Sequence, residues 1–338
     1  MRNVFIAFSL AVVITSCGVK QKVYHFAEGP VHGTSYHITY EYFQNSKLED
    51  DIVDVMEEID MSLSTYIPGS IISRVNNNDP DVEPDEYFTT VFERGRQISE
   101  RTGGAFDMTV APLVNAYGFG FDERKTITGE LIEELLKITG YDKIRIEDGR
   151  IIKDNPRIML DASAIAKGFS VDMVSGLLER KGVDNYLVEI GGEVRCRGLN
   201  PKGLKWKIGV DKPLENMLGR EIQIVLNLSD ISLATSGNYR QFYEEGTTRY
   251  SHTIDPSTGK PVTHNLLSAT VLASDCMTAD AYATAFMVMG LDKSLELVNS
   301  DEGLQGYFIY SNEEGEFRTA YSRGLEAFIE GGSQAGSL

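Results

Sequence analysis

Two oxygen-bearing residues lie four positions apart in a segment whose hydrophobic pattern predicts a helix. Asp280 and Thr284 fall within residues 278–299, where apolar residues recur at helical spacing. Residues four apart share one helix face, and Mg²⁺ prefers a carboxylate and a hydroxyl as hard oxygen ligands. Both also have structural explanations, because an early acid complements the helix dipole and a threonine bonds back to its own helix. On spacing alone, the structural explanation is favoured.

A lysine stands at a predicted strand-to-helix turn. A strand over residues 158–160 leads into a run of small residues, Lys167 follows, and a helix over residues 168–181 comes next. This order places backbone N–H groups and a cation where an anion can bind. The GxxxxGK[ST] spacing of a P-loop is absent. A tight turn with a solvated lysine is the alternative.

His252 and Asp255 belong to a segment rich in polar side chains, residues 250–261. Only five histidines occur in the chain, and a neutral imidazole can accept a proton near pH 7. A single histidine is nevertheless more often structural than catalytic. Residues 255–259 read Asp-Pro-Ser-Thr-Gly, a strong turn signal in which the aspartate needs no catalytic explanation.

Three other glycine-containing segments could approach a ligand closely, since glycine lacks a Cβ atom. They cover residues 101–107, 189–193 and 234–239. In the first, Phe106 could pack on a planar ring and Asp107 could accept a hydrogen bond. Taken singly, these segments also read as a helix end, a hairpin turn and a helix or strand cap.

The elements that must position these residues alternate irregularly between helices and strands. Helical spacing occurs at residues 48–59, 88–98 and 131–138, the last with Thr128 as N-cap. Strands are predicted at residues 37–43, 143–146, 150–152, 187–190, 193–197, 206–210 and 221–228. The irregular order favours an α+β fold over regular βαβ repeats.

Length and charge limit the class of protein. The chain has 338 residues, 42% of them hydrophobic, which suffices for one large domain or two small ones and argues against disorder. Asp and Glu number 50 against 32 Lys and Arg, a net charge of −18. No cluster of basic residues stands out, so we expect no nucleic-acid partner.

The N-terminus reads as an export signal. Arg2 precedes an apolar run over residues 4–14, too short for a membrane-spanning helix but typical of a signal peptide. Residues 14–17, Ile-Thr-Ser-Cys, resemble a bacterial lipobox, which predicts cleavage of residues 1–16 and lipidation of Cys17; a signal peptide with a chance cysteine is the alternative. We expect a tether over residues 17–24, a domain over residues 25–330 and a flexible tail over residues 331–338.

The other two cysteines, Cys196 and Cys276, could pair in an oxidising compartment. The sequence does not place them within bridging distance. We expect both to be ordinary buried residues.

In order and spacing, these motifs resemble the ApbE family, the FAD:protein FMN transferases. The resemblance runs from about Gly33 to Gly290. The matching segments are residues 33–36, 62–66, 102–107, 161–168, 191–192, 235–237, 252–259 and 279–284. Each is weak alone, but eight in order are specific. One departure is His32, because the family often has a flavin-contacting Met there.

The resemblance implies a single T-fold-like α+β domain with a mixed, mainly antiparallel sheet packed by helices. It implies that FAD is the substrate, with Mg²⁺ on its pyrophosphate. A Thr or Ser hydroxyl of an acceptor attacks the FMN-side phosphorus, and AMP leaves. The acceptor is expected to be a flavoprotein subunit of a membrane redox complex. Exported lipoproteins are common in the family, so we expect a membrane-anchored protein facing the periplasm.

The resemblance also assigns roles to residues. Asp280 and Thr284 would bind Mg²⁺ through their side chains, and Ala164 through its carbonyl. His252 would accept the proton of the acceptor hydroxyl, and Asp255 would orient it or merely form the turn. The FAD contacts would be Tyr66, Ala105, Phe106, Asp107, Asp161, Lys167 and Thr253.

Two other functions share these motifs. An FAD pyrophosphatase would use water in place of the acceptor hydroxyl. A lipoprotein that stores or delivers FAD would need the pocket without catalytic geometry. A purely structural lipoprotein fits poorly, because it gives no reason for the ordered glycine-rich segments.

Overall fold

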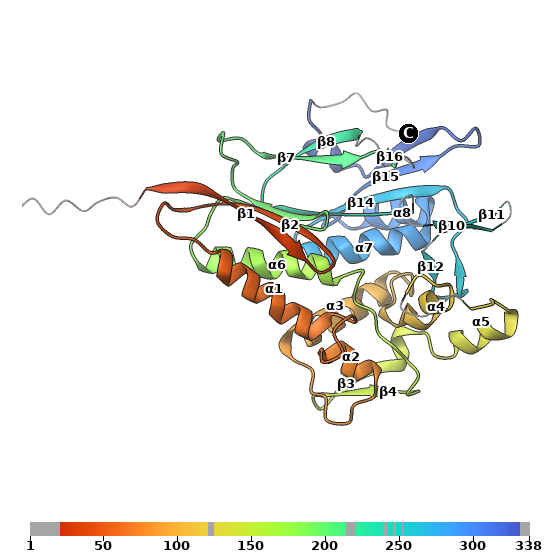
Figure 1. The fold of residues 1–338 in the computed structure, drawn as a ribbon. Coiled ribbons are helices and arrows are strands. Elements are labelled where there is room, and N and C mark those ends of the chain that lie inside the picture. The colour runs from red at the N-terminus through yellow and green to blue at the C-terminus, as the bar shows by residue number, and fades with distance from the viewer. Residues whose placement is uncertain are drawn as a thin grey trace, which may run out of the picture.

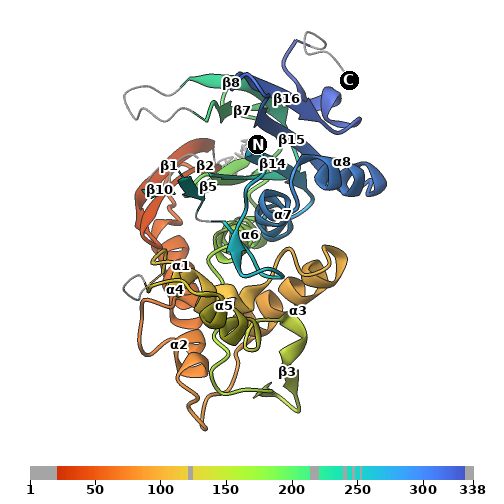
Figure 2. The same ribbon diagram turned by 90° about the vertical axis from the view of Figure 1, so that its right-hand side faces the viewer.

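An eight-stranded antiparallel sheet forms the centre of the fold, with the strand order β1-β2-β5-β6-β9-β14-β15-β16 (Figures 1 and 2). The computed structural model describes residues 21–120, 125–213, 221–238, 242–245, 248–251 and 253–331. The strands of this sheet are β1 Lys22–Val31, β2 Thr34–Phe43, β5 Tyr186–Ile190, β6 Glu193–Arg197, β9 Ile231–Gly237, β14 Leu266–Ala273, β15 Gln305–Ser311 and β16 Phe317–Tyr321.

Helices α6 and α7 lie against one face of this sheet, and the β7–β8 hairpin lies over the other (Figure 1). The helices are α1 Glu49–Leu63, α2 Ile71–Asn76, α3 Glu86–Arg101, α4 Ala111–Ala116, α5 Gly129–Leu136, α6 Ala166–Arg180, α7 Cys276–Met289 and α8 Leu291–Ser300, with 3₁₀ turns at Met108–Val110, Tyr141–Lys143 and Leu325–Phe328. The two-stranded sheets are β3 Ile144–Glu147 with β4 Arg150–Lys153, β7 Trp206–Asp211 with β8 Ile222–Leu228, β10 Phe242–Glu245 with β11 Thr248–Ser251, and β12 Ile254–Asp255 with β13 Lys260–Pro261. This arrangement confirms the predicted single α+β domain.

Helix α7 is the buried centre of the helical layer. It is apolar on nearly all sides, as expected of a helix enclosed by other elements. Asp172 of α6 accepts hydrogen bonds from the Cys276 and Met277 amides at 2.9 and 2.8 Å, and Arg195 donates to the same carboxylate at 2.8 Å. These bonds hold the first turn of α7 against α6. They therefore fix the position of Asp280 and Thr284, which follow on α7, relative to α6.

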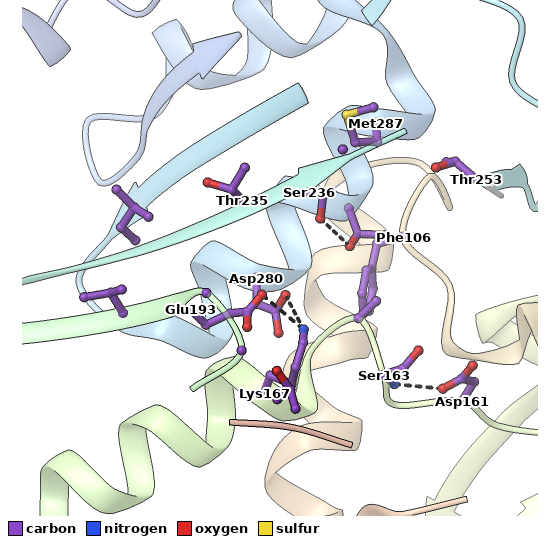
Figure 3. Close-up of a pocket in the computed structure, with 18 of the residues that line it drawn as sticks. Phe106, Asp161, Ser163, Lys167, Glu193, Thr235, Ser236, Thr253, Asp280 and Met287 are labelled. Atoms are coloured by element: carbon purple, nitrogen blue, oxygen red, sulfur yellow. Dashed lines mark hydrogen bonds and ion pairs between the residues drawn. The ribbon is translucent and has the colours of Figure 1, made fainter. Parts of the chain in front are cut away.

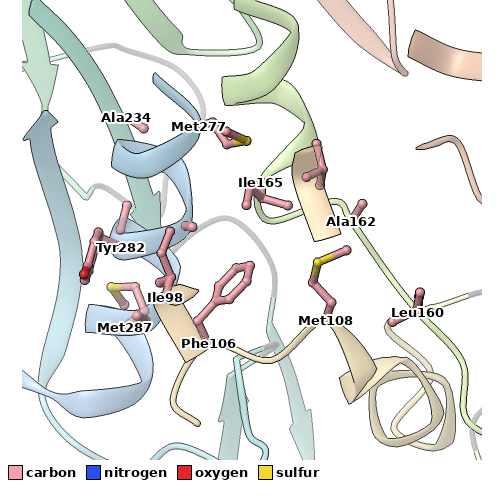
Figure 4. Packing of buried hydrophobic residues seen from close by; sticks show 14 of the residues in the cluster. Ile98, Phe106, Met108, Leu160, Ala162, Ile165, Ala234, Met277, Tyr282 and Met287 are labelled. Carbon is pink, nitrogen blue, oxygen red and sulfur yellow. The ribbon is translucent and has the colours of Figure 1, made fainter. Parts of the chain in front are cut away.

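Core packing continues from α7 into the loop after α3 (Figure 4). Phe106 and Met108 are buried in one cluster with Met277, Tyr282 and other apolar residues of α7. The loop that carries Phe106 is therefore held by the same core that holds α7.

Three predicted elements differ from the structure. The helix expected over residues 278–299 is two helices, because Gly290 adopts a φ of 77° and ends α7 there. The prediction of a strand over residues 158–160 is wrong. The N–H and C=O groups of Leu160 form hydrogen bonds with the side-chain amide of Asn76 and not with a neighbouring strand. Strand β1 begins at Lys22, three residues inside the segment expected as a tether.

Both described cysteines are free and buried, which confirms the prediction that they are ordinary core residues. The Cys196 thiol points to the Ile231 carbonyl and the Cys276 thiol to that of Leu233. Burial raises the pKa of Cys196 to about 12, so this thiol is unreactive at neutral pH. Within the described ranges, no helix has both the length and the apolar character needed to span a membrane.

Replacing Asp85, the N-cap residue of α3, tests how much this cap stabilises the helix. Asp85 accepts hydrogen bonds from the Phe88 amide at 2.7 Å and from the Ser62 hydroxyl at 2.8 Å. We expect Asp85→Ala to lower the free energy of unfolding in urea by about 1–2 kcal/mol, and Asp85→Asn by a few tenths because it retains the cap. Equal losses in the two variants would argue against capping as the cause.

Candidate active site

A pocket of about 940 Å³ lies between α7, the β5–β6 hairpin and the loops before α4 and α6 (Figure 3). Most of the site residues predicted from the sequence meet in it, although they come from distant segments. Those that line it are Tyr66, Ala105, Phe106, Asp107, Asp161, Ala164, Lys167, Thr253, Asp280 and Thr284. The fold therefore brings the predicted ligand-binding and metal-binding residues together in one place.

Three predicted residues are not placed in this pocket. Asp255 is absent from its lining; its carboxylate accepts hydrogen bonds from the amide and hydroxyl of Ser257 at 2.8 and 2.7 Å. These contacts support the turn-forming role for Asp255. His252 and Cys17 lie outside the described residues.

Three charged side chains form the centre of the pocket. The Lys167 ammonium lies 3.1 Å from Glu193 Oε1 and 3.8 Å from Asp280 Oδ1. Asp280 is only 2% exposed and Glu193 is also buried, whereas 30% of the Lys167 side chain remains accessible. The lysine is thus the accessible member of a cluster with a formal charge of −1 when all three groups are ionised.

Burial and charge act in opposite directions on this cluster. Burial disfavours the charged form of Lys167, but Asp280 and Glu193 outweigh it and raise the pKa of the lysine. Burial raises the pKa of Glu193, whereas the neighbouring Lys167 ammonium lowers it and so favours the ionised carboxylate. At neutral pH the lysine is therefore charged.

Glu193 is a site residue that the sequence analysis missed. It follows Gly191 and Gly192, whose φ values of 63° and 103° form the β5–β6 turn. A Cβ atom on Gly191 would lie 2.9 Å from Thr34 and 3.2 Å from Lys167, so glycine permits the close approach. Glu193 Oε2 is buried and has no hydrogen-bond partner among the described residues, which marks it as a group that a ligand can satisfy.

The oxygen atoms near Asp280 fit a hard cation. Asp280 Oδ2 accepts a hydrogen bond from the Gly168 amide at 3.0 Å, and Thr284 Oγ1 lies 3.2 Å from Ser236 Oγ. In a regular helix the Gly168 amide would donate to the Ala164 carbonyl. Because it donates to Asp280, it leaves that carbonyl without a backbone partner in the described part of the chain. No group of three or more His, Cys, Asp and Glu side chains forms a metal site in the described residues, and the all-oxygen set suits Mg²⁺.

The other lining residues form the walls and mouth of the pocket. Phe106 presents its ring to the cavity from within the core (Figure 3). Tyr66 is 82% exposed at the mouth. Asp107 accepts from the Thr109 amide and hydroxyl and from the Tyr141 amide, so its carboxylate holds the loop. Asp161 caps the turn before α6 by accepting from the Ser163 amide at 2.8 Å.

His32, the departure from the family pattern, faces another direction. His32 and Gly33 both have positive φ values and form the β1–β2 hairpin turn. The ring nitrogens of His32 lie 2.8 Å from Asp60 Oδ1 and 2.7 Å from Ser170 Oγ. These contacts hold His32 against α1 and α6, and it does not line the pocket.

The fold and the pocket define an α+β domain with a large ligand site, built around a lysine–carboxylate cluster. The model of the ApbE family matches residues 32–308. The chain belongs to the ApbE family.

Named relatives are similar to this chain in sequence and structure over nearly its whole length. The FAD:protein FMN transferase of Vibrio cholerae is 37% identical, covering 91% of this chain and 97% of the relative. That of Haemophilus influenzae is 36% identical, covering 96% and 97%. The structure of the flavin transferase ApbE from Vibrio cholerae superposes with a TM-score of 0.82 at 35% identity, covering 91% of this chain and all of the other. The Pseudomonas stutzeri flavinyl transferase ApbE gives 0.82 at 29% identity, covering 93% and 99%.

Proposed function

We propose that this enzyme transfers FMN from FAD to a Thr or Ser hydroxyl of an exported or membrane-bound electron-transport protein, releasing AMP, and that transfer requires Mg²⁺. The relatives named FAD:protein FMN transferase support the reaction. The observation that carries the proposal is the convergence, in one pocket, of residues from distant segments to which the family resemblance assigns FAD and metal binding.

The proposed reaction is a phosphoryl-type substitution without redox change. The acceptor oxygen forms a bond to the FMN-side phosphorus, and the bond from that phosphorus to the bridging oxygen breaks. AMP departs with the bridging oxygen. The proton of the hydroxyl passes to a base, for which we propose His252. Such transfers depend chiefly on alignment and charge stabilisation.

The charge of the cluster supports a requirement for a cation. Lys167 already faces two carboxylates, so it cannot alone neutralise the pyrophosphate of FAD. We propose that Asp280, Thr284 and the Ala164 carbonyl hold Mg²⁺. The bound ion would supply charge neutralisation at the phosphates.

Replacing the lysine should weaken FAD binding. Lys167→Met removes the accessible cation and leaves Glu193 and Asp280 facing each other without compensation. We expect the Kd for FAD to rise about tenfold or more and the transfer rate to fall, because a hydrogen bond or ion pair to a charged group contributes about 1.5–3 kcal/mol. Fluorescence titration of FAD measures the first effect. An unchanged Kd would show that Lys167 does not face the phosphates.

One assay separates the proposed reaction from its alternatives. The enzyme is incubated with FAD, Mg²⁺ and a soluble acceptor domain, and the products are resolved by gel fluorescence and chromatography. A fluorescent acceptor together with AMP supports transfer. FMN and AMP without labelling indicate a pyrophosphatase, and intact retained FAD indicates binding alone.

Export and lipid anchoring through Cys17 are a separate proposal, which rests on the lipobox-like residues 14–17. Cells grown with an alkynyl fatty acid should label the native chain. The Cys17→Ser variant should lose the label and leave the membrane fraction. Labelling that persists in this variant would contradict the proposal.

A further inference from the structure

The pocket has a second arm that none of the predicted FAD contacts line. Figure 3 shows Glu193 on the side of the Lys167–Asp280 pair away from Phe106, Thr253 and Asp161. Beyond Glu193, the lining comes from β5 and β6 of the central sheet and from β7 of the hairpin that covers it. This arm includes Leu187, Glu189 and residues 207–211. The pocket therefore extends from the charged cluster to strand β7.

Strand β7 presents its edge, not one of its faces, to this second arm. Residues 207–211 all line the pocket, whereas a strand that offered one face would contribute alternate residues. Gly209 can contribute only backbone atoms. Strand β7 pairs with β8 alone in the described part of the chain, so its other edge is open.

The alternation of backbone groups shows which atoms face the open edge. On the outer side of β8, the Glu330 amide donates to the Val225 carbonyl at 2.9 Å. The backbone groups of successive residues in a strand point to opposite sides. The N–H and C=O groups of Val225 and Asn227 therefore point away from β7. Their partners in the register are Gly209 and Lys207. The N–H and C=O groups of Lys207 and Gly209 therefore point into the second arm.

Exposed apolar side chains lie on β1 and β8, the strands next to β2 and β7, which line the pocket. Phe26, Thr39 and Leu187 lie opposite one another on β1, β2 and β5, and Phe26 is 71% exposed. Ile222 is 58% exposed and lies against Gly209, where an added Cβ would be 3.3 Å from its Cδ1. Open strand edges and exposed apolar side chains are both features of peptide-binding surfaces.

We propose that the segment of the acceptor protein that carries the reactive hydroxyl binds in extended conformation along the open edge of β7. It would form backbone hydrogen bonds with Lys207 and Gly209 and place the hydroxyl beside Lys167, Glu193 and Asp280. Apolar residues of the segment would contact Phe26 and Ile222. This inference rests on the proposed transfer function.

The burial of the reaction centre favours an extended segment over a folded surface. Asp280 is almost inaccessible, so the acceptor chain must enter the pocket to bring its hydroxyl near. An extended segment can enter the pocket and satisfy its own backbone groups on the open edge of β7.

Amide hydrogen exchange tests this assignment on the unaltered enzyme. The probe is a soluble acceptor domain that becomes fluorescent in the transfer assay, with its reactive threonine replaced by valine so that the complex persists. We expect saturating probe to slow exchange of the Lys207 and Gly209 amides at least about tenfold. The Ile208 and Val210 amides, already bonded to β8, should change little. Unchanged exchange at Lys207 and Gly209, or equal slowing by FAD alone, would overturn the assignment.

A pair of variants gives an independent test. Gly209→Pro removes an N–H that does not belong to the β7–β8 ladder, so the variant should fold. Gly209→Ala adds the same Cβ and keeps the N–H. We expect the proline variant to raise the KM for the original acceptor domain at least about tenfold with the Kd for FAD unchanged, and the alanine variant to resemble the parent. Similar KM values in both variants would overturn the edge assignment while leaving the transfer function, established by the labelled acceptor, intact.

Discussion

Asp280→Ala is expected to lower the rate of flavin transfer by at least about 1,000-fold at saturating FAD and Mg²⁺. The variant removes the carboxylate among the proposed metal ligands and the acceptor of the Gly168 amide. A bound metal contributes several kcal/mol of transition-state stabilisation, which corresponds to a factor of this size. The measurement is the initial rate of acceptor labelling across a titration of Mg²⁺.

A second acid on the same helix provides the control. Asp275 caps α7 by accepting from the Thr278 amide at 2.9 Å and does not line the pocket. Asp275→Asn removes one negative charge but keeps an oxygen that can cap the helix. We expect it to retain activity. Full Mg²⁺-dependent transfer by Asp280→Ala would remove this residue from the metal site, and equal losses in both variants would point to the fold of α7 instead.

The sequence predicted the composition of the site better than its geometry. Asp280, Thr284 and Lys167 each had a plausible structural explanation, and only the ordered family motifs joined them. The structure places all three in one pocket because α6 and α7 pack side by side at the end of the β5–β6 hairpin. This contact joins residues more than 100 positions apart, which no local pattern records.

Glu193 shows why part of the site could not be found from sequence. A glutamate after two glycines is typical of a hairpin turn, and the β5–β6 pairing confirms that hairpin. Its second property, a buried carboxylate 3.1 Å from Lys167, depends on where the hairpin ends relative to α6. The one signal in the sequence is the pair of glycines before Glu193, because a glycine at position 191 allows Thr34 and Lys167 to approach the backbone closely.

The errors in the predicted elements have a similar origin. Apolar spacing continues on both sides of Gly290, so the pattern predicts one helix, but the glycine reverses the backbone there. Residues 158–160 are apolar and therefore predict a strand, yet the side chain of Asn76 from α2 takes the hydrogen bonds of the Leu160 backbone. In the first case a single backbone angle determines the secondary structure, and in the second a tertiary contact does. The hydrophobic pattern of the sequence contains neither.

The negative net charge of the chain also affects how the pocket can bind FAD. A net charge of −18 opposes the binding of an anion such as FAD. The pocket does not reverse this with a basic surface; Lys167 is offset by Glu193 and Asp280. A divalent cation and backbone N–H groups would therefore have to overcome the field. We expect FAD binding to depend steeply on Mg²⁺ for this reason.

Gly168→Ala is expected to disrupt the site and lower the stability of the protein by about 3 kcal/mol or more. A Cβ atom at this position would lie 2.4 Å from the Cys276 carbonyl oxygen and 2.8 Å from Asp280 Cβ. These atoms belong to the backbone and to the stem of a buried side chain, so no rotamer change can relieve the overlap. Helices α6 and α7 must separate, which breaks the Gly168–Asp280 hydrogen bond and moves Asp280 away from Lys167.

Gly176 in the same helix supplies the matched control. A Cβ there would meet only the end of the Arg180 side chain, at 3.3 Å, which can move aside. Gly176→Ala should therefore leave transfer unchanged and raise the free energy of unfolding by up to about 1 kcal/mol, because alanine is the better helix former. Urea denaturation and the transfer rate are measured for both variants. If Gly168→Ala matched Gly176→Ala in stability and activity, the close contact between α6 and α7 would not be what holds Asp280 in place.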